Sequence, residues 1–209
     1  MAKNNWRFVA TLLLIFGFVF CLGSKTLAEV SVGNTAPEFS LPDTKGKAQS
    51  LKDFKGKFVV LEWVNFGCPF VKKHYETGNM QALQKEFTKK GVVWLTICST
   101  NKDHKDYRDA TQTNKLIAEK KAEPTAYLLD PDGTVGRLYG AKATPTMFVI
   151  DKGGKLIYGG AIDDKAGVSH DEVKTARNYV REALNSAMAG KKVETTSSKA
   201  YGCSVKYAH

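Results

Sequence analysis

The chain has 209 residues, and its 31 lysines and arginines outnumber its 21 acidic residues, which gives a formal net charge of +10. This length is enough for one domain with a substantial core. The lysines are scattered and mostly accompanied by acidic residues, a pattern that is typical of a solvated basic surface rather than a nucleic-acid groove. No nucleic-acid partner is therefore expected.

The N-terminal segment has the pattern of an export signal. Lys3 and Arg7 are basic, residues 8–22 are almost wholly apolar, and a cleavage point is expected near Ala28. Residues 1–28 are therefore predicted to be a secretory signal, which places the protein in the periplasm or cell envelope, without membrane association once the signal is removed. Because the apolar run is long for a signal and short for a membrane span, an uncleaved anchor is the alternative.

Three cysteines follow the predicted signal: Cys68, Cys98 and Cys203. In an exported chain, an odd number of cysteines cannot form a fully paired disulfide framework. At least one thiol is therefore free or exchanges partners, which favours redox chemistry.

The next part of the chain alternates apolar runs with helical patterns. Residues 29–57 are an extended lead-in rich in turn residues. Residues 58–64 are almost continuously apolar, which predicts a strand buried on both faces. A helix of about twenty residues should follow and end at Gly91, and residues 92–97 predict a second buried strand. The apolar positions that indicate the helix are Met80, Leu83 and Phe87.

The following region predicts one more helix and three more strands. A polar surface helix is expected over residues 105–122, and a short strand over residues 125–129. Residues 146–150 and 156–161 flank the turn at 151–154, which is the pattern of a hairpin. Strands that alternate with helices indicate a largely parallel sheet, to which this hairpin adds antiparallel strands.

A last helix is predicted from a capping box, because Glu172 follows Ser169 by three residues, and it should end at Gly190. Its apolar face would consist of Val173, Ala176, Val180, Ala183 and Leu184. The sequence therefore predicts one α/β domain over residues 29–190, with a central mixed sheet flanked by helices. Residues 191–209 are polar, lack an apolar period and are predicted to be a C-terminal tail.

Cys68 begins the tetrapeptide Cys68-Pro69-Phe70-Val71, where the first strand gives way to a helical stretch. Pro69 suits the first helical turn, so the thiol would lie at a helix N-terminus, where free N–H groups favour the thiolate. Lys72 would share its helix face and favour the thiolate further. The spacing is that of a redox C-x-x-C motif whose second cysteine is replaced by Val71. A buried structural thiol is the alternative.

Three segments carry a pattern that can be compared with known families: Val32-Gly33-x-x-Ala36-Pro37-x-Phe39-x-Leu41, Leu51-x-Asp53-Phe54-x-Gly56-Lys57, and Tyr139-Gly140 followed by Ala143-Thr144-Pro145-Thr146-Met147-Phe148-Val149-Ile150-Asp151. In order and spacing they resemble the redoxin group, which comprises the alkyl hydroperoxide reductase/thiol-specific antioxidant family and the thioredoxin-like proteins of bacterial envelopes. The resemblance covers about residues 30–185 and implies a thioredoxin fold.

The resemblance implies roles for three residues. Cys68 matches the attacking cysteine, Pro145 matches the cis-proline that lies against the active-site sulfur, and Glu62 matches the buried acid that relays protons in thioredoxins. Glu62 is also unusual in its own right, because a carboxylate in an apolar strand needs a partner or a raised pKa. Pairing with Lys57 or Lys155 is the alternative.

The chain also departs from both parts of the redoxin group. Val71 removes the resolving cysteine of the thioredoxin mechanism. Peroxiredoxins have a proline and a threonine at the positions of Leu61 and Asn65. The hydroxyl that helps to polarise a peroxide is therefore missing, although Asn65 could donate a hydrogen bond in its place.

Cys203 lies between aromatic residues in the predicted tail and is the candidate resolving cysteine. Roughly 13 residues separate it from Gly190 and span about 43–47 Å when extended, against a radius of gyration of about 15 Å for such a domain, so it can reach Cys68. The aromatic neighbours favour a segment that docks. The alternatives are a thiol that only ties the tail down or has no role, and Cys98, which ends the second strand at the same sheet edge.

We therefore expect an exported thiol–disulfide oxidoreductase or a thiol-dependent, peroxiredoxin-like antioxidant peroxidase. Its partners would be a protein disulfide or a peroxide as substrate and an envelope thiol reductant, with no cofactor and no metal. One alternative is a copper-binding carrier, as found among related envelope redoxins, with Cys68, Cys203 and either His74 or His209 as ligands. Another is a redoxin domain that binds without catalysis.

Overall fold

The computed structural model describes residues 30–208. The predicted export signal, residues 1–28, and the candidate ligand His209 lie outside the described residues. Within residues 30–208, no helix combines the length and the apolar character needed to cross a membrane.

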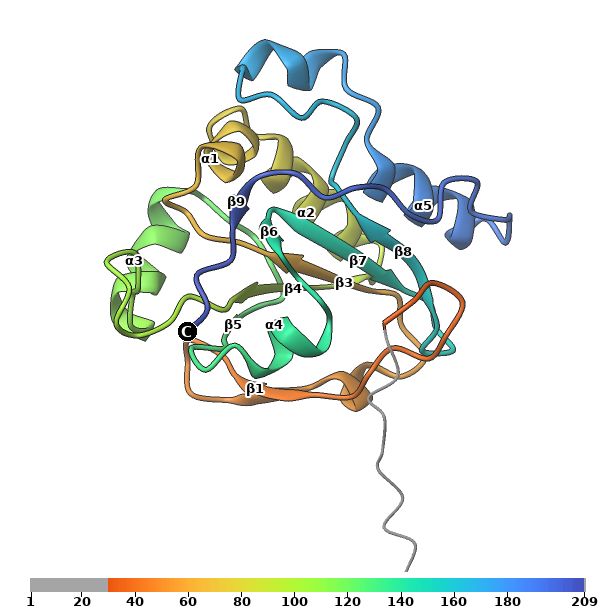
Figure 1. The fold of residues 1–209 in the computed structure, drawn as a ribbon. Helices are drawn as coiled ribbons and strands as arrows, with labels where there is room; N and C mark the ends of the chain where they lie inside the picture. Colours follow the sequence, from red (N-terminus) through yellow and green to blue (C-terminus); the bar gives the residue numbers. More distant parts are fainter. Residues whose placement is uncertain (1–29, 209) are drawn as a thin grey trace, which may run out of the picture.

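A five-stranded sheet in the order β5–β4–β3–β7–β8 forms the centre of the molecule (Figure 1). The pairs β3–β4 and β4–β5 are parallel, whereas β3–β7 and β7–β8 are antiparallel. The predicted mixed sheet with its final hairpin is thus confirmed. The strands are β3 (Val59–Trp63), β4 (Val93–Cys98), β5 (Ala126–Leu129), β7 (Thr146–Ile150) and β8 (Leu156–Gly160).

Helices and short strands surround this sheet. The α-helices are α1 (Pro69–Glu76), α2 (Asn79–Lys89), α3 (Ala110–Glu119), α4 (Thr134–Leu138) and α5 (Tyr179–Met188), and the 3-10 helices are η1 (Leu51–Phe54) and η2 (His170–Lys174). The strands β1 (Ser40–Pro42) and β2 (Ala48–Ser50) pair in the lead-in, and β6 (Ala143–Thr144) pairs with β9 (Cys203–Ser204).

Both faces of β3 are buried, each against a different layer. Val60 and the following Val64 belong to a core shared with α1, α2 and α5. Val59, Leu61 and Trp63 belong to a second core shared with the lead-in and α4. Because successive strand residues point to opposite faces, a strand between two cores is apolar at nearly every position.

The prediction of one helix of about twenty residues after β3 is wrong, because the chain forms the two helices α1 and α2 there. Gly78 precedes α2 with φ 75°, a left-handed conformation that glycine adopts without steric cost. The apolar spacing continues across the break because Tyr75 of α1 and Met80 and Leu83 of α2 contribute to the same core.

The long helix predicted from Ser169 is also wrong. Ser169 accepts a hydrogen bond from a backbone N–H at the start of η2, and α5 begins separately, where the Asn178 side chain accepts from the N–H of Arg181 at 2.9 Å. The surface helix predicted over residues 105–122 is shorter, because Asp109 caps α3.

The C-terminal segment runs back across the domain and ends beside α4 (Figure 1). Ser197 forms a parallel bridge with Gly159 of β8. Farther on, β9 pairs antiparallel with β6, with Cys203 opposite Thr144. This segment therefore borders the strand-to-helix corner that contains Cys68.

Candidate active site

Cys68 is the N-cap residue of α1, and Pro69 occupies the first turn, as the sequence predicts. Asn65 shapes the turn before it, because its carbonyl accepts from the Cys68 N–H at 2.9 Å and its side-chain oxygen accepts from the Gly67 N–H at 2.7 Å. Only 3% of Cys68 is exposed. The thiol is thus held at a helix N-terminus but is covered.

The Thr144–Pro145 peptide bond is cis and lies against this thiol. The Cys68 thiol donates a hydrogen bond to the carbonyl oxygen of Thr144, with a distance of 3.2 Å between sulfur and oxygen. Pro145 therefore sits where the redoxin resemblance implies.

Cys203 approaches Cys68 from the other side of the same turn. Its backbone pairs with that of Thr144, the residue whose carbonyl accepts from the Cys68 thiol. No disulfide joins the three cysteines of residues 30–208. The site therefore brings together two reduced thiols that are 135 positions apart in the chain.

The pKa values of the two thiols shift in opposite directions. Burial raises the pKa of Cys68, but hydrogen bonds from Cys203, Thr144 and the backbone N–H groups of Val71 and Cys203 outweigh it, so the pKa of Cys68 is lowered. Burial, together with the hydrogen bond and the charge of Cys68, raises the pKa of Cys203 to about 11. Cys68 is thus the sulfur prepared to be a thiolate, and Cys203 the one that keeps its proton.

Glu62 is fully buried in β3 and accepts hydrogen bonds only from neutral groups. The donors are the Tyr75 hydroxyl at 2.8 Å, Gln84 Nε2 at 3.0 Å, Trp94 Nε1 at 2.7 Å and Thr96 Oγ1 at 2.9 Å. Burial raises the pKa of the Glu62 carboxyl despite these hydrogen bonds. Glu62 therefore has four hydrogen-bond partners as well as a raised pKa.

The alternative pairing of Glu62 with Lys57 or Lys155 is not found among the described residues. The network also links the sheet to the helix that Cys68 caps, because Tyr75 belongs to α1. Sequence reasoning singled out the carboxyl but not its four partners, because they come from three other elements.

The AhpC/TSA family matches residues 32–159. The chain belongs to this family. The thiol-disulfide oxidoreductase ResA of Bacillus thuringiensis subsp. konkukian (strain 97-27) is 33% identical over 162 residues, which cover 75% of this chain and 88% of ResA. The thioredoxin-like protein YneN of Bacillus subtilis (strain 168) is 31% identical over 151 residues, which cover 63% of this chain and 87% of YneN.

A solved structure extends the similarity to the fold. An uncharacterized conserved protein from Geobacillus kaustophilus matches with a TM-score of 0.74 and 26% identity, over 87% of this chain and 94% of that one. Together with the relatives above, the structure identifies this AhpC/TSA member as a thioredoxin-like oxidoreductase with a thioredoxin fold.

Cys98 does not join the two thiols of this redoxin. It ends β4, and its thiol donates to Thr100 Oγ1 at 3.3 Å. It lines a hollow of about 260 Å³ that also includes Asn65 and Gly67 of the turn before Cys68. Neither Cys68 nor Cys203 lines this hollow, so Cys98 borders that turn from outside the thiol pair.

His74 belongs to α1 and is fully buried, and both of its ring nitrogens are engaged. Nε2 lies 3.1 Å from the Tyr201 hydroxyl, and Nδ1 lies 2.9 Å from Asn79 Nδ2. Burial and the charge of Lys73 lower the pKa of His74 to about 3. Residues 30–208 contain no cluster of three or more histidine, cysteine or acidic side chains placed to hold a metal ion. The copper-carrier alternative thus gains no support from these residues.

Sequence reasoning missed the residue that holds the tail at this point. The Tyr201 hydroxyl donates to Asp163 Oδ1 at 2.6 Å and contacts His74, while its ring lies 5.9 Å from that of Phe70 and 5.1 Å from Lys73 Nζ. The aromatic residues beside Cys203 were the only available signal, because the partners of Tyr201 lie 38 and 127 positions away.

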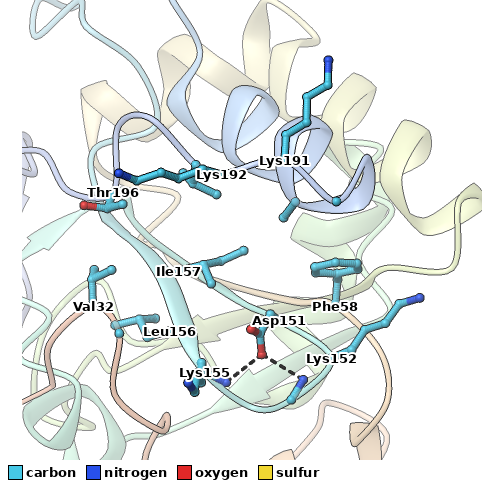
Figure 2. Close-up of a pocket in the computed structure, with 15 residues that line it drawn as sticks. Val32, Phe58, Asp151, Lys152, Lys155, Leu156, Ile157, Lys191, Lys192 and Thr196 are labelled. Atoms are coloured by element: carbon cyan, nitrogen blue, oxygen red, sulfur yellow. Dashed lines mark hydrogen bonds between the residues drawn. The ribbon is translucent and has the colours of Figure 1, made fainter.

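Another hollow lies away from the thiol pair (Figure 2). It measures about 490 Å³ and lies between the lead-in, the turn after β7 and the end of α5. Phe58, Leu156 and Ile157 give it an apolar floor, and Lys191 and Lys192 belong to its rim. No cysteine lines it. The thiol pair therefore lies at a strand edge rather than in this hollow.

Proposed function

We propose that this protein is an exported thiol–disulfide oxidoreductase in which Cys68 attacks and Cys203 resolves. The observation that carries the proposal is that the β6–β9 pair sets Cys203 opposite Thr144, whose carbonyl accepts from the Cys68 thiol at 3.2 Å. The lowered pKa of Cys68 suits a nucleophile, and the raised pKa of Cys203 suits a thiol that waits for the second step. Export is supported by the signal-like pattern of residues 1–28.

Two exchanges complete the proposed reaction. The Cys68 thiolate attacks one sulfur of a protein disulfide, forming a mixed disulfide and releasing the other substrate sulfur as a thiolate. Cys203 then gives up its proton and attacks the Cys68 sulfur, so that a Cys68–Cys203 disulfide forms and the remaining substrate sulfur leaves. The substrate is reduced, and an envelope thiol reductant restores the two thiols of the protein by the same chemistry.

The other candidate residues have supporting roles in this proposal. Pro145 and its cis bond hold the carbonyl of Thr144 against Cys68. Asn65 fixes the turn that presents the thiol. Glu62 is proposed as the proton relay, because burial raises the pKa of its carboxyl and its partner Tyr75 lies on the helix that begins at Cys68.

A hydroperoxide is the second candidate oxidant, because it would meet the same nucleophile, and membership of the AhpC/TSA family favours it. However, Asn65 stands at the position of the peroxiredoxin threonine, and its Nδ2 already donates to Thr100 Oγ1 at 3.3 Å. The relatives whose names state a thiol–disulfide activity favour a disulfide as the main substrate.

The test compares hydrogen peroxide and a protein disulfide as oxidants of the reduced protein. Wild type, Cys68→Ser, Cys203→Ser and the matched control Cys98→Ser are followed by stopped-flow kinetics and by mass spectrometry of the products. We expect a Cys68–Cys203 bridge in wild type and in Cys98→Ser, and faster oxidation by the disulfide. A bridge to Cys98, or full reactivity of Cys68→Ser, would contradict the proposal.

A further inference from the structure

The edge of β6 beside Cys68 is already occupied by the chain itself. β9 pairs with it, so that Cys203 is opposite Thr144 and Ser204 is opposite Ala143. Val205 continues the contact, because its N–H donates to the carbonyl of Lys142 at 3.1 Å. A strand edge presents a row of free N–H and C=O groups that an extended peptide can pair with. Here the C-terminal segment fills those positions.

The surface is shaped to receive this segment. Gly136 has an ordinary backbone conformation, yet a side chain there would collide with the Tyr207 ring and hydroxyl. A Cβ on Gly202 would collide with the carbonyl of Thr144, so the residue before Cys203 has no room for a side chain. The two backbones and the ring therefore meet more closely than other residues would allow.

Two tyrosines hold the segment on either side of Cys203. Tyr201 is hydrogen-bonded to His74 and Asp163, as described above. The Tyr207 hydroxyl donates to the carbonyl of Ala141 at 2.6 Å, and the Arg137 guanidinium lies 4.6 Å from its ring. The anchors are made by side chains, whereas the stretch between them pairs through the backbone. Beyond Cys203, the carbonyl of Lys206 also accepts from the N–H of Asn101 at 2.8 Å. The arrangement is thus a strap anchored on both sides of the thiol.

This strap conflicts with the access that a protein substrate needs. Cys68 is 3% exposed, and Tyr201 and Cys203 pack against the core cluster that includes it. The paired backbones at Thr144 bring the sulfur of the added strand to Cys68. A cysteine of another protein gains the same relation to Cys68 only by taking the same edge.

We propose that the β6 edge is the docking site for an extended, cysteine-bearing segment of a partner protein, and that residues 199–208 occupy this edge as an intramolecular competitor. The inference rests on the proposed function. The strap leaves, the partner segment pairs with β6, and Cys68 forms the mixed disulfide by the exchange given above. The strap then returns, and Cys203 attacks Cys68 while its strand displaces the partner from the edge. The same contacts thus favour release of the reduced partner.

The test uses cysteine-containing peptides activated as mixed disulfides with an aromatic thiol, whose release is followed by absorbance. One peptide has a normal backbone, and its matched control is N-methylated at the residues flanking the cysteine, which removes the N–H groups needed for strand pairing. The proteins are full-length wild type, Tyr207→Ala and Tyr207→Phe. Hydrogen exchange of residues 199–208 reports whether the strap is released.

We expect Tyr207→Ala to release the strap and to accelerate the reaction of the normal peptide about tenfold, equivalent to about 1.4 kcal/mol. Tyr207→Phe keeps the ring and should change the rate less. The N-methylated peptide should gain much less from Tyr207→Ala. If the strap exchanges like wild type in Tyr207→Ala, the double variant Tyr201→Ala/Tyr207→Ala takes its place in the same comparison.

Equal rates for the two peptides in a variant whose strap is released would overturn the docking edge. An unchanged rate for the normal peptide in that variant would overturn the competition. Failure of the proposed function looks different, because Cys68→Ser would then release the aromatic thiol as fast as wild type with either peptide.

Discussion

Cys68 and Cys98 follow two neighbouring parallel strands, and both lie at the carboxyl edge of the sheet, yet their surroundings differ. After β3 a short turn leads into α1, so Cys68 lies at the helix N-terminus, beside the cis-proline turn and close to Cys203. After β4 the chain forms a loop before α3, and Cys98 donates to Thr100. Position at a strand end therefore does not by itself determine the surroundings of a thiol, because of these two cysteines it is Cys68 that has helix N–H groups and a second cysteine beside it.

The largest effect is expected when each thiol is removed in turn, which tests whether Cys68 and Cys98 differ in function. Cys68→Ser should lower the rate of disulfide exchange by about 10³-fold or more, because the nucleophile is lost. Cys98→Ser should leave the rate within about twofold, since a hydroxyl can keep the hydrogen bond to Thr100. The rates are measured with the same protein disulfide at one pH. Comparable losses of rate in the two variants would show that Cys68 and Cys98 contribute equally to disulfide exchange.

Replacing Cys203 alone separates the attack by Cys68 from the resolution by Cys203. Cys203→Ser should leave a single attack by Cys68 intact but abolish turnover, because the mixed disulfide has no internal thiol to resolve it. Mass spectrometry of the quenched reaction should show the substrate bound through Cys68. A bridge from Cys68 to Cys98 in this variant would show that Cys98 can also resolve the mixed disulfide.

The sequence predicted the Cys68 corner more completely than the strap. An apolar run, a proline in the first helical turn and a redoxin pattern all lie within or close to that corner, so local rules and family resemblance reach the same residue. The break at Gly78 was missed because Met80 and Leu83 continue the helical spacing of α1 and pack on the same core.

The length of the tail shows that Cys203 can reach Cys68, but the sequence does not predict where Cys203 lies in the fold. The strap has no apolar period, and its order depends on Tyr201 and Tyr207 meeting partners from distant parts of the chain. Gly133, Gly136 and Gly202 adapt the two surfaces to each other, and none of these glycines reveals its contact in the sequence. The position of Cys203 is therefore set by tertiary contacts that the sequence pattern does not reveal.

The titration of Cys68 gives a finer test of what Cys203 contributes. The lowered pKa of Cys68 should make its thiolate form at a pH below that of an ordinary thiol, whose pKa is about 8.5. In Cys203→Ala the pKa of Cys68 should rise, because one hydrogen-bond donor to the sulfur is lost while the helix N–H groups remain. Thiolate ultraviolet absorbance, with Cys68→Ser as the blank, measures both. No difference between wild type and Cys203→Ala would mean that the helix alone sets the pKa.

The smallest expected effect concerns His74, which lies behind the corner and beneath the strap. Its folded-state pKa of about 3 is below the unfolded value of about 6.5, so between these values the unfolded state binds more protons. Its contribution therefore makes the free energy of unfolding fall as the pH is lowered from about 6.5 towards 3, by at most about 1.4 kcal/mol per pH unit.

Urea unfolding at a series of pH values tests this contribution of His74. His74→Gln cannot take up that proton and retains polar atoms for Tyr201 and Asn79, so its stability should depend less steeply on pH than that of wild type. The neighbouring Asp163 works in the opposite direction, because burial raises its pKa, and its Oδ2 lies 4.0 Å from His74 Nε2, so the difference between the two proteins reports His74 together with its effect on Asp163. Parallel pH profiles for wild type and His74→Gln would show that His74 is not held neutral behind the Cys68 corner, and that the strap is anchored to an imidazole that can take up a proton.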